Sequence, residues 1–595
     1  MELQIPILLG AIAIVVVTFS SRRLGAPAPL LLVLVGVLVS FLPWVGEVKV
    51  EPELVLAGIL PPLLYSGAVN IPAMGFRRDF RPIAGLSVLL VILTSIGVGL
   101  LFAWIVPGIG LPTGIALAAI VSPTDAVATT LVRRVGAPER VVTVLEGESL
   151  LNDASALVIL RSAVAAIAGS VSFGWIALDF VWAVVAAVVI GFAVGQISLR
   201  LRSHLHDPVL NTAVSFVIPF VAYLPAEHLG ASGLVAAVLA GLVFGQFAPA
   251  FLTPQERRSE EANWRTVEFL LEGSIFLLMG LELSGLLADV RDEGDSLARA
   301  LWLGAVGLLA VLAVRAIYLS GLILGQRRER ADLPGQREQL VSTRQRLDTE
   351  ERPWSATAEL KGIPRAIASK HNGRAVTPEL FEQQRTRVRR YFDMRIADLD
   401  YLIAEPIGKR EGALLVWAGM RGAVTLAAAQ SLPRDTPQRD LLVLIAFVVA
   451  AGSLLIQGGT LPWLTRRLGV TASKGDGSER AERRALAQRL SALSSELCDD
   501  PTLMRANGSA FDAAVHQRVC QDGQAVSELL SDPSVSYEQY PELRIRILHA
   551  QRTLLLDLRD EGGYSAGALD DALAILDSDE IALAVRESAF EQRGE

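Results

Sequence analysis

Charged residues and cysteines are scarce in this chain of 595 residues. Only 19% of the residues are Asp, Glu, Lys or Arg, below the roughly 25% of a typical soluble domain, which argues against a soluble enzyme. The two cysteines, Cys498 and Cys520, fall in a polar C-terminal region that we expect to be cytoplasmic. Reducing conditions there disfavour structural disulfides, and no metal-ligand spacing involves either cysteine. The N-terminus has no basic segment before its first apolar run, so we expect no cleaved signal peptide.

Apolar residues make up 52% of the chain and gather in long runs. A membrane-spanning helix needs about 20 mostly apolar residues. The sequence therefore predicts an all-α polytopic membrane protein with about thirteen transmembrane helices. We place these spans at residues 4–20, 28–45, 52–70, 82–107, 111–132, 141–168, 173–199, 208–225, 229–249, 265–288, 300–325, 412–432 and 438–465.

The orientation follows from the basic residues between the spans. Alternate loops are rich in arginine, whereas the intervening loops have few basic residues, and the positive-inside rule puts the arginine-rich set in the cytoplasm. We therefore expect the N-terminus outside and the C-terminus inside, as an odd number of spans requires. The arginine-rich loops contain Arg22, Arg23, Arg77, Arg78, Arg81, Arg133, Arg134, Arg140, Arg200, Arg202, Arg257, Arg258, Arg265, Arg327, Arg328, Arg466 and Arg467.

Two polar regions divide the chain. We predict spans 1–11 in residues 1–325, a cytoplasmic insertion in 326–411, spans 12–13 in 412–469, and an α-helical cytoplasmic domain in 470–595. Within the insertion, Pro378 suits the first position of a helix that should run toward Leu402. The C-terminal region has no Gly-rich phosphate loop and no Walker lysine, so a structural or regulatory role is the default. We expect no nucleic-acid partner.

An aspartate lies inside span five. An ionised Asp near the bilayer centre costs roughly 2.5–3.5 kcal/mol, so it persists mainly where it faces a cavity, a partner, a proton or a cation. Before Asp125, Pro123 lacks an amide proton and disfavours helix in the preceding residue, which predicts a break around Ser122 to Asp125. Such breaks at the midplane expose carbonyls and are the usual ion sites of secondary transporters. Thr124 and Asp125 add oxygen ligands. The alternative is a proline kink with a capping aspartate.

The spacing in span six places a second aspartate. Ser149 and Asp153 are four residues apart and share a helix face, whereas Glu148 and Asn152 lie on a different face. Asp153 is thus expected to face the break in span five, and Glu148 to form a structural ion pair. Arg421 in span twelve needs a counter-charge and is the expected partner; interfacial snorkelling is the alternative. Glycines on both sides of Arg421 allow that helix to break as well.

These motifs, in this order, resemble the monovalent cation/proton antiporters of the sodium/hydrogen exchanger (NhaP-like) family. The resemblance covers residues 1–469 apart from the insertion. Several prokaryotic relatives carry a Glu in span three where this chain has Ser66, and the insertion is longer than expected. The matching segments are Ser122-Pro-Thr-Asp125, Glu146-Gly-Glu-Ser-Leu-Leu-Asn-Asp153, Arg421-Gly-Ala-Val424, Leu60-Pro-Pro-Leu-Leu-Tyr-Ser-Gly67 and Leu277-Leu-Met-Gly-Leu-Glu-Leu283.

The resemblance implies a site and a fold. Asp153 would bind sodium and protons alternately, and Glu148 and Arg421 would form a structural pair. The implied fold is an inverted repeat with broken crossing helices, a mobile core domain and a dimerisation domain, so a homodimer in the cell membrane is expected. No cofactor is implied beyond the transported sodium ion and proton. The residues expected to form the ion site are Asp153, Asp125, Thr124, Ser149 and Asn152.

The expected activity is electroneutral exchange of sodium, with lithium as a further candidate cation, for protons, in pH and sodium homeostasis. Asp153 would be neutral when protonated and charge-balanced when it holds a cation, and the empty anion would be penalised in the membrane. Three alternatives stay open: a potassium/proton antiporter, a cation channel and an intramembrane aspartyl protease. For the protease, Asp125 and Asp153 have no Gly-x-Gly-Asp motif around them.

Overall fold

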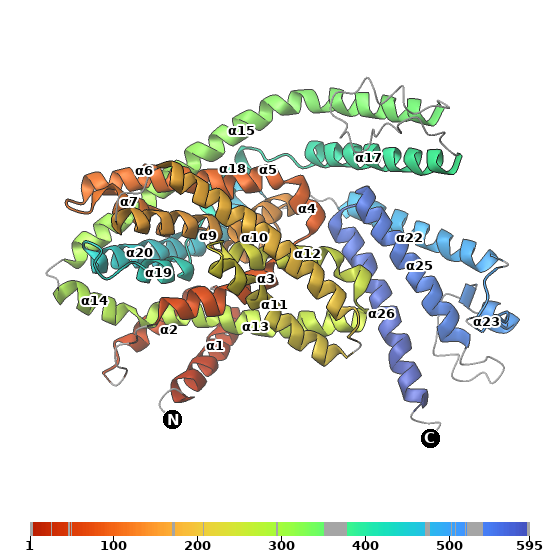
Figure 1. The fold of residues 1–595 in the computed structure, drawn as a ribbon, viewed down its shortest axis with the longest axis horizontal. Helices are drawn as coiled ribbons and strands as arrows, with labels where there is room; N and C mark the ends of the chain where they lie inside the picture. The colour runs from red at the N-terminus through yellow and green to blue at the C-terminus, as the bar shows by residue number, and fades with distance from the viewer. Residues whose placement is uncertain are drawn as a thin grey trace. The chain divides into compact units, whose positions relative to one another are not determined.

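All regular elements of the described residues are helices, in a computed structural model of the chain (Figure 1). The structure describes residues 4–24, 27–43, 45, 48, 50–125, 127–168, 173–205, 207–292, 296–349, 378–470, 476–500, 502–505, 507–517, 519–520 and 539–591. The chain divides into two compact units. The first comprises Met1–Gln326 and Ile407–Ser473, and the second comprises Arg327–Pro406 and Lys474–Glu595.

The first unit holds the apolar helices. Among the described residues, eight helices are long and apolar enough to cross a membrane, and four apolar segments are shorter. Each of the predicted spans falls on one of these or on a pair of short helices, as at span twelve. The α-helices are α1 (Gln4–Leu24), α2 (Ala28–Ser40), α3 (Leu60–Val69), α4 (Ala73–Arg78), α5 (Phe80–Ala84), α6 (Leu90–Ile105), α7 (Gly110–Val121), α8 (Val127–Arg134), α9 (Glu139–Ala168), α10 (Phe173–Arg202), α11 (Pro208–His228), α12 (Gly233–Phe251), α13 (Pro254–Leu281), α14 (Leu283–Asp292), α15 (Leu297–Thr349), α18 (Lys409–Trp417), α19 (Ala423–Gln430), α20 (Arg439–Ser453) and α21 (Gly459–Leu468). Short π-helical segments, η1 (Leu54–Ile59), η2 (Gly85–Leu89) and η3 (Leu454–Gly458), precede α3, α6 and α21.

Local sequence signals set where several of these helices begin. Asp207 precedes α11, and its carboxylate accepts hydrogen bonds from the amides of Val209 and Leu210. At α13, Thr253 and Glu256 form a capping box. Such caps satisfy backbone N–H groups that have no partner within the helix. They fix the start of α13, the helix that later supplies two carboxylates to the candidate site.

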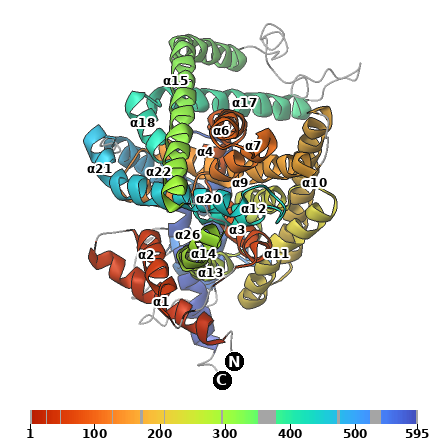
Figure 2. The ribbon, with the colours of Figure 1, turned by 90° about the vertical axis from the view of Figure 1, so that its left-hand side faces the viewer.

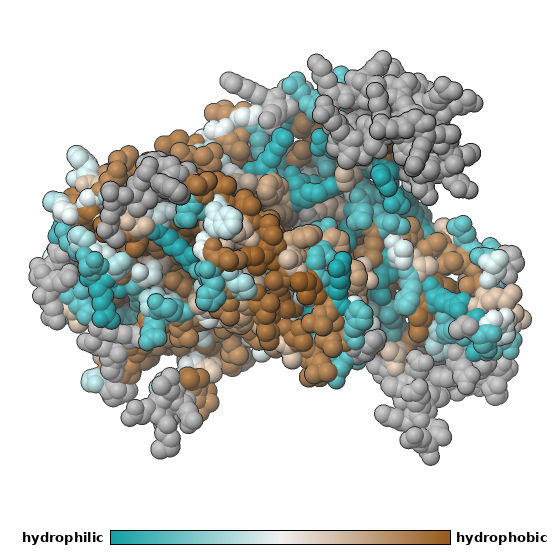
Figure 3. Space-filling model, viewed as in Figure 1, coloured by the Kyte–Doolittle hydropathy of each residue, from teal (hydrophilic) through white to brown (hydrophobic). Residues whose placement is uncertain are grey.

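Figures 1 and 2 show how the helices of the first unit are arranged, and most of their close packing falls within two groups that also touch each other. In one group α2 and α1 pack on α13, and α3 and α10 pack on α12. In the other, α7 packs on α6, α9, α19 and α20. The face that includes α10 is rich in exposed apolar side chains (Figure 3), among them Val181, Val185 and Val189 at one-turn spacing. A stripe of this kind on an apolar helix is expected to face lipid.

Buried charges in the first unit are paired. Arg202 at the end of α10 donates to Glu260 of α13, at 3.1 and 2.6 Å, and to the side-chain oxygen of Asn211. Its guanidinium also lies 4.2 Å from the ring centre of Phe244. Because an unpaired buried charge is costly, this bidentate pair fixes α10 against α13.

The second unit contains the polar helices. Its members are the end of α15, α17 (Pro378–Ala404), α22 (Asp476–Asp499), α23 (Ala513–Gln517), α25 (Gln539–Glu561) and α26 (Ala566–Glu591). The predicted helix of the insertion begins at Pro378, as expected, and ends at Ala404. Within this unit α25 packs against α26 and α22.

The expectation of unpaired cysteines is wrong. Cys498 and Cys520 form a disulfide, with their Cα atoms 5.9 Å apart. The end of α22 and the segment after α23 meet over a small apolar cluster that includes Val515, Leu543 and Ile547. This packing brings the two cysteines together across 22 residues of sequence. The redox conditions of a cell compartment do not reveal which cysteines lie close together in the fold.

Candidate functional site

Two interrupted helices meet at the centre of the first unit. In span five, α7 ends at Val121 and α8 begins at Val127; in span twelve, α18 ends at Trp417 and α19 begins at Ala423. The predicted break around Pro123 is confirmed, and the second helix breaks at the expected glycines. The backbone N–H of Asp125 donates to the carbonyl of Met420 at 2.8 Å, so the two interruptions are joined directly.

Arg421 satisfies carbonyl groups that the breaks leave free. Its Nε donates to the carbonyl of Val121 at 3.0 Å, a terminal nitrogen donates to the carbonyl of Gly419, and its backbone N–H donates to Ser453 Oγ at 2.8 Å. The side chain is 1% exposed. An arginine can serve here because its fork of donors reaches carbonyls on both broken helices. Arg421 therefore holds the crossing together rather than lying at an interface.

The predicted pairing of Glu148 with Arg421 is corrected. Arg315 of α15 donates to both carboxylate oxygens of Glu148, one bond being 2.8 Å long, and its Nε donates to the carbonyl of Leu415 at 3.0 Å. Both side chains of the pair are almost fully buried. Arg315 takes the role because its guanidinium reaches both the carboxylate on α9 and a carbonyl of α18. The guanidinium of Arg421 instead donates to carbonyl groups.

A chain of hydrogen bonds connects this ion pair to the break in span five. Asn152 Nδ2 donates to Thr124 Oγ1 at 2.7 Å, and Thr124 Oγ1 donates to Glu148 Oε1 at 3.2 Å. All three side chains are buried. Asn152 thus orients the unwound segment, and it is not among the residues that line the adjacent cavity.

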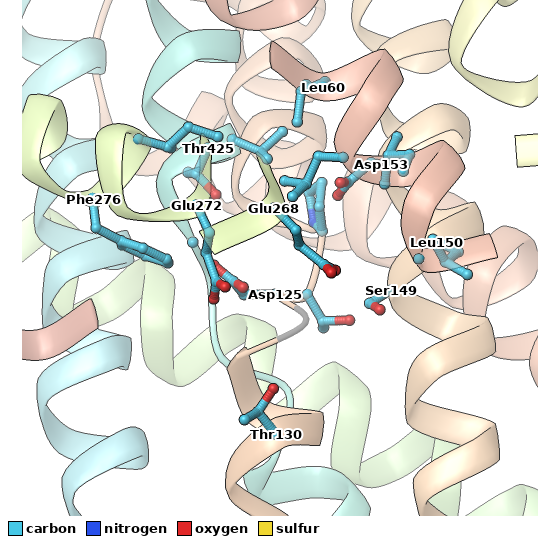
Figure 4. A pocket seen from close by; sticks show the side chains of 18 residues that line it. Leu60, Asp125, Thr130, Ser149, Leu150, Asp153, Glu268, Glu272, Phe276 and Thr425 are labelled. Atoms are coloured by element: carbon cyan, nitrogen blue, oxygen red, sulfur yellow. The ribbon is translucent and has the colours of Figure 1, made fainter. Parts of the chain in front are cut away.

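The cavity brings four of the predicted site residues together. It has a volume of about 140 Å³ and is lined by Thr124, Asp125, Ser149 and Asp153 (Figure 4). Asp153 and Ser149 are each 6% exposed. Asp125 also caps α8, since its Oδ1 accepts from the amide of Val127 at 2.9 Å. Two carboxylates and two hydroxyls around a space that accommodates several waters are suited to a hard, monovalent cation.

Sequence reasoning missed two further carboxylates of the cavity. Glu268 and Glu272 of α13 line it together with Asp125 and Asp153, and so does Thr425 of α19 (Figure 4). Glu268 also lies beside Ser66 of α3. The available signal was the one that identified Asp125: acidic residues inside a predicted span, here residues 265–288.

Helices broken at mid-length that cross beside buried carboxylates are typical of secondary active transporters. The chain belongs to the sodium/hydrogen exchanger family: the model of its transmembrane domain, described as "Sodium/hydrogen exchanger, transmembrane", matches residues 10–329 and 392–467. This family is one of multi-pass membrane antiporters, and the residues between the two matched stretches fall within the predicted insertion.

Individual proteins agree with the family. A Mycobacterium tuberculosis protein named as an uncharacterized Na(+)/H(+) exchanger is 28% identical over 594 residues, covering 96% of this chain and 94% of the relative. A Bacillus pumilus protein named as a sodium, potassium, lithium and rubidium/H(+) antiporter is 27% identical over 458 residues, covering 74% and 58%. The solved structure of the sodium proton antiporter MjNhaP1 from Methanocaldococcus jannaschii matches 79% of this chain and 99% of its own, with a TM-score of 0.51 and 16% identity. This last likeness shows the fold.

Proposed function

We propose that this protein exchanges sodium for protons by competition at Asp153, with lithium as a further substrate and with one cation moved per proton. The observation that carries the proposal is the placement of Asp153 and Asp125 in one cavity beside the crossing of the two broken helices. Bare carboxylates in such a place need a positive partner. Among the described lining residues no Lys or Arg supplies one.

The mechanism follows from that missing partner. When Asp153 binds sodium or a proton, its charge is neutralised, and the loaded site can move through the low-dielectric interior. When it is empty, the anion is penalised by desolvation, so the return step requires the other ion. Thr124 and Ser149 supply oxygen ligands, Asn152 orients the unwound segment, and the ion pairs and carbonyl contacts of Glu148, Arg315 and Arg421 keep the crossing intact. One ion gradient then drives the other.

The location and assembly are part of the same proposal. We infer a cell-membrane protein with its N-terminus outside and its C-terminus in the cytoplasm, from the arginine distribution between the spans. A homodimer would provide a fixed frame for the moving helices, and the group of α1, α2 and α13 is the candidate for that frame. Exchange of this kind would serve pH and sodium homeostasis.

A second candidate substrate is potassium. The printed name of the Bacillus pumilus relative includes potassium and rubidium besides sodium and lithium. The same carboxylate chemistry accepts any of these cations, and the cavity of about 140 Å³ is large enough to leave part of a hydration shell in place. A potassium/proton exchanger would use the same residues with a different preference.

The test is ion-coupled proton movement in proteoliposomes. An imposed pH gradient is followed with a pH-sensitive dye while sodium, lithium or potassium is added. Sodium should dequench the dye in the wild type and have no effect in Asp153→Asn. The control Asp179→Asn changes an exposed carboxylate outside the cavity and should behave as the wild type. A response to potassium alone would mean that the transported cation is potassium rather than sodium. Sodium-coupled exchange by correctly folded Asp153→Asn would reject the mechanism.

A further inference from the structure

Helix α13, which is not one of the two broken helices, presents two carboxylates to the cavity. Glu268 and Glu272 are four residues apart, so they lie one turn from each other on the same face. Both are half-buried and line the same space as Asp125 and Asp153 (Figure 4). Glu272 interacts electrostatically with both Asp125 and Glu268. The cavity is therefore surrounded by four acidic side chains.

No basic side chain among the described lining residues balances these charges. The arginines that act on the two glutamates, Arg265 and Arg134, lie outside the lining. Arg265 is itself paired with Glu261 at 2.5 Å, on a more exposed part of α13. Like charges one helical turn apart are destabilising. The compensating charge must therefore come from ions or protons inside the cavity.

Thr425 gives an independent indication of a ligand. Its side chain is 1% exposed, it lines the cavity, and its hydroxyl oxygen has no hydrogen-bond partner within the described part of the chain. A buried hydroxyl without a partner is costly, and buried hydroxyl groups are normally satisfied by protein, water or ligand. Thr425 belongs to α19, which follows the break in span twelve and packs against α13. Its oxygen is thus available at the same wall of the cavity as the glutamates.

The two acidic pairs belong to different groups of helices. Asp125 and Asp153 lie with α7, α8 and α9, and Thr425 of α19 belongs to the same group. By contrast, α13 packs with α1 and α2 and meets the other group where it contacts α19. If one group moves relative to the other during exchange, the two carboxylates of α13 do not travel with Asp153. They are placed to hold a cation that has not yet reached Asp153 or has just left it.

We propose that Glu268, Glu272 and Thr425 form a second binding station for a partly dehydrated monovalent cation, which exchanges its ion with Asp153. This inference rests on the proposed function, because it concerns the same transported cation. Carboxylate and hydroxyl oxygens are the ligands that hard cations prefer. The station concentrates sodium next to Asp153 and so sets the apparent affinity, without being essential for the coupling of sodium to protons.

The first arm of the test measures exchange kinetics. Glu268→Gln/Glu272→Gln should raise the KM for sodium roughly tenfold, the effect of losing one good ligand interaction, while sodium still drives proton movement at saturation. Thr425→Val, which keeps the side-chain shape, should raise KM in the same direction. Asp179→Asn is the control, because it removes an exposed carboxylate outside the cavity. An unchanged KM for sodium in both cavity variants would contradict the proposed second binding station.

The second arm measures equilibrium binding of radioactive sodium to purified protein. Asp153→Asn should retain sodium binding that competes with lithium, and the triple variant Asp153→Asn/Glu268→Gln/Glu272→Gln should lose it, both being checked for a monodisperse size-exclusion profile. Absence of sodium binding in folded Asp153→Asn would overturn the second station alone, provided the wild type exchanges sodium for protons. Absence of exchange in the wild type would instead overturn the proposed function.

Discussion

Arg315 donates to both carboxylate oxygens of Glu148, and neither side chain is more than 2% exposed. The pair joins α15 to α9, and Glu148 in turn accepts from Thr124 in the broken segment of span five. A single ion pair thus connects a continuous helix with the interruption that carries Asp125. Its position is structural, since Glu148 does not line the cavity.

Breaking this pair should destabilise the protein strongly. Arg315→Leu or Glu148→Gln leaves an uncompensated buried partner, which typically costs about 3–5 kcal/mol. The double variant should recover much of the loss, because it buries no isolated charge. Thermal melting in detergent, followed by size-exclusion chromatography, measures the effect. The control is Arg133→Ala, because Arg133 and its partner Glu146 form a more exposed ion pair. Exposed pairs contribute about 0–1 kcal/mol to the free energy of unfolding. Equal melting temperatures for the buried and exposed variants would contradict this assignment.

Much of the fold and part of the site were predictable from local physical constraints. The length of the apolar runs predicts the helices, and Pro123 predicts the break because its effect on the backbone acts on the adjacent residues. The four-residue spacing of Ser149 and Asp153 predicts their shared face in the same way. These features depend on residues that are close in sequence, so no knowledge of packing was needed.

The errors concern partners that are distant in sequence. Glu148 and Arg315 are 167 residues apart, and Arg421, which also lies inside a span, was an equally reasonable partner by charge alone. What decides between them is that Arg421 is turned toward the carbonyls of Val121 and Gly419. Glu268 and Glu272 carry a local signal, because they are acidic residues inside a predicted span, but tertiary packing decides that they face the same cavity as Asp125. The disulfide of the second unit depends on packing in the same manner.

Asn152 should act on the cation site through Thr124. In Asn152→Ala the hydrogen bond to Thr124 Oγ1 is lost, which typically costs about 1–3 kcal/mol when the partner stays buried. If the unwound segment then shifts, the KM for sodium in proteoliposomes should rise by roughly tenfold. Ser155→Ala is the control: it lies on the same helix, and its hydroxyl donates to the carbonyl of Leu151 in that helix. An Asn152→Ala variant with wild-type KM would show that Thr124 is held in place without it.

The disulfide of the second unit should be chemically detectable. Protein isolated in the presence of an alkylating agent should carry no label on Cys498 or Cys520 until a reductant is added. The variant Cys498→Ser/Cys520→Ser should lose about 2–4 kcal/mol of the free energy of unfolding of that unit, because the cross-link restricts the unfolded chain. Mass spectrometry and the urea midpoint of the reduced and oxidised protein measure both effects. Labelling of both cysteines without reduction would contradict the bond.

Gly422 should be intolerant of any side chain because of Asp125. An added Cβ at this glycine would overlap the Asp125 carboxylate, whereas a Cβ at Gly452 of α20 would meet no atom within 4 Å. Overpacking typically costs about 1–3 kcal/mol, and if Asp125 moves to relieve it, sodium affinity should fall by roughly five- to hundredfold. We therefore expect Gly422→Ala to raise the KM for sodium and Gly452→Ala to leave it unchanged, at similar amounts of folded protein. Wild-type exchange by Gly422→Ala would mean that the carboxylate of Asp125 does not lie against Gly422 during transport. The cation site would then include Asp125 in a different position from the one described here.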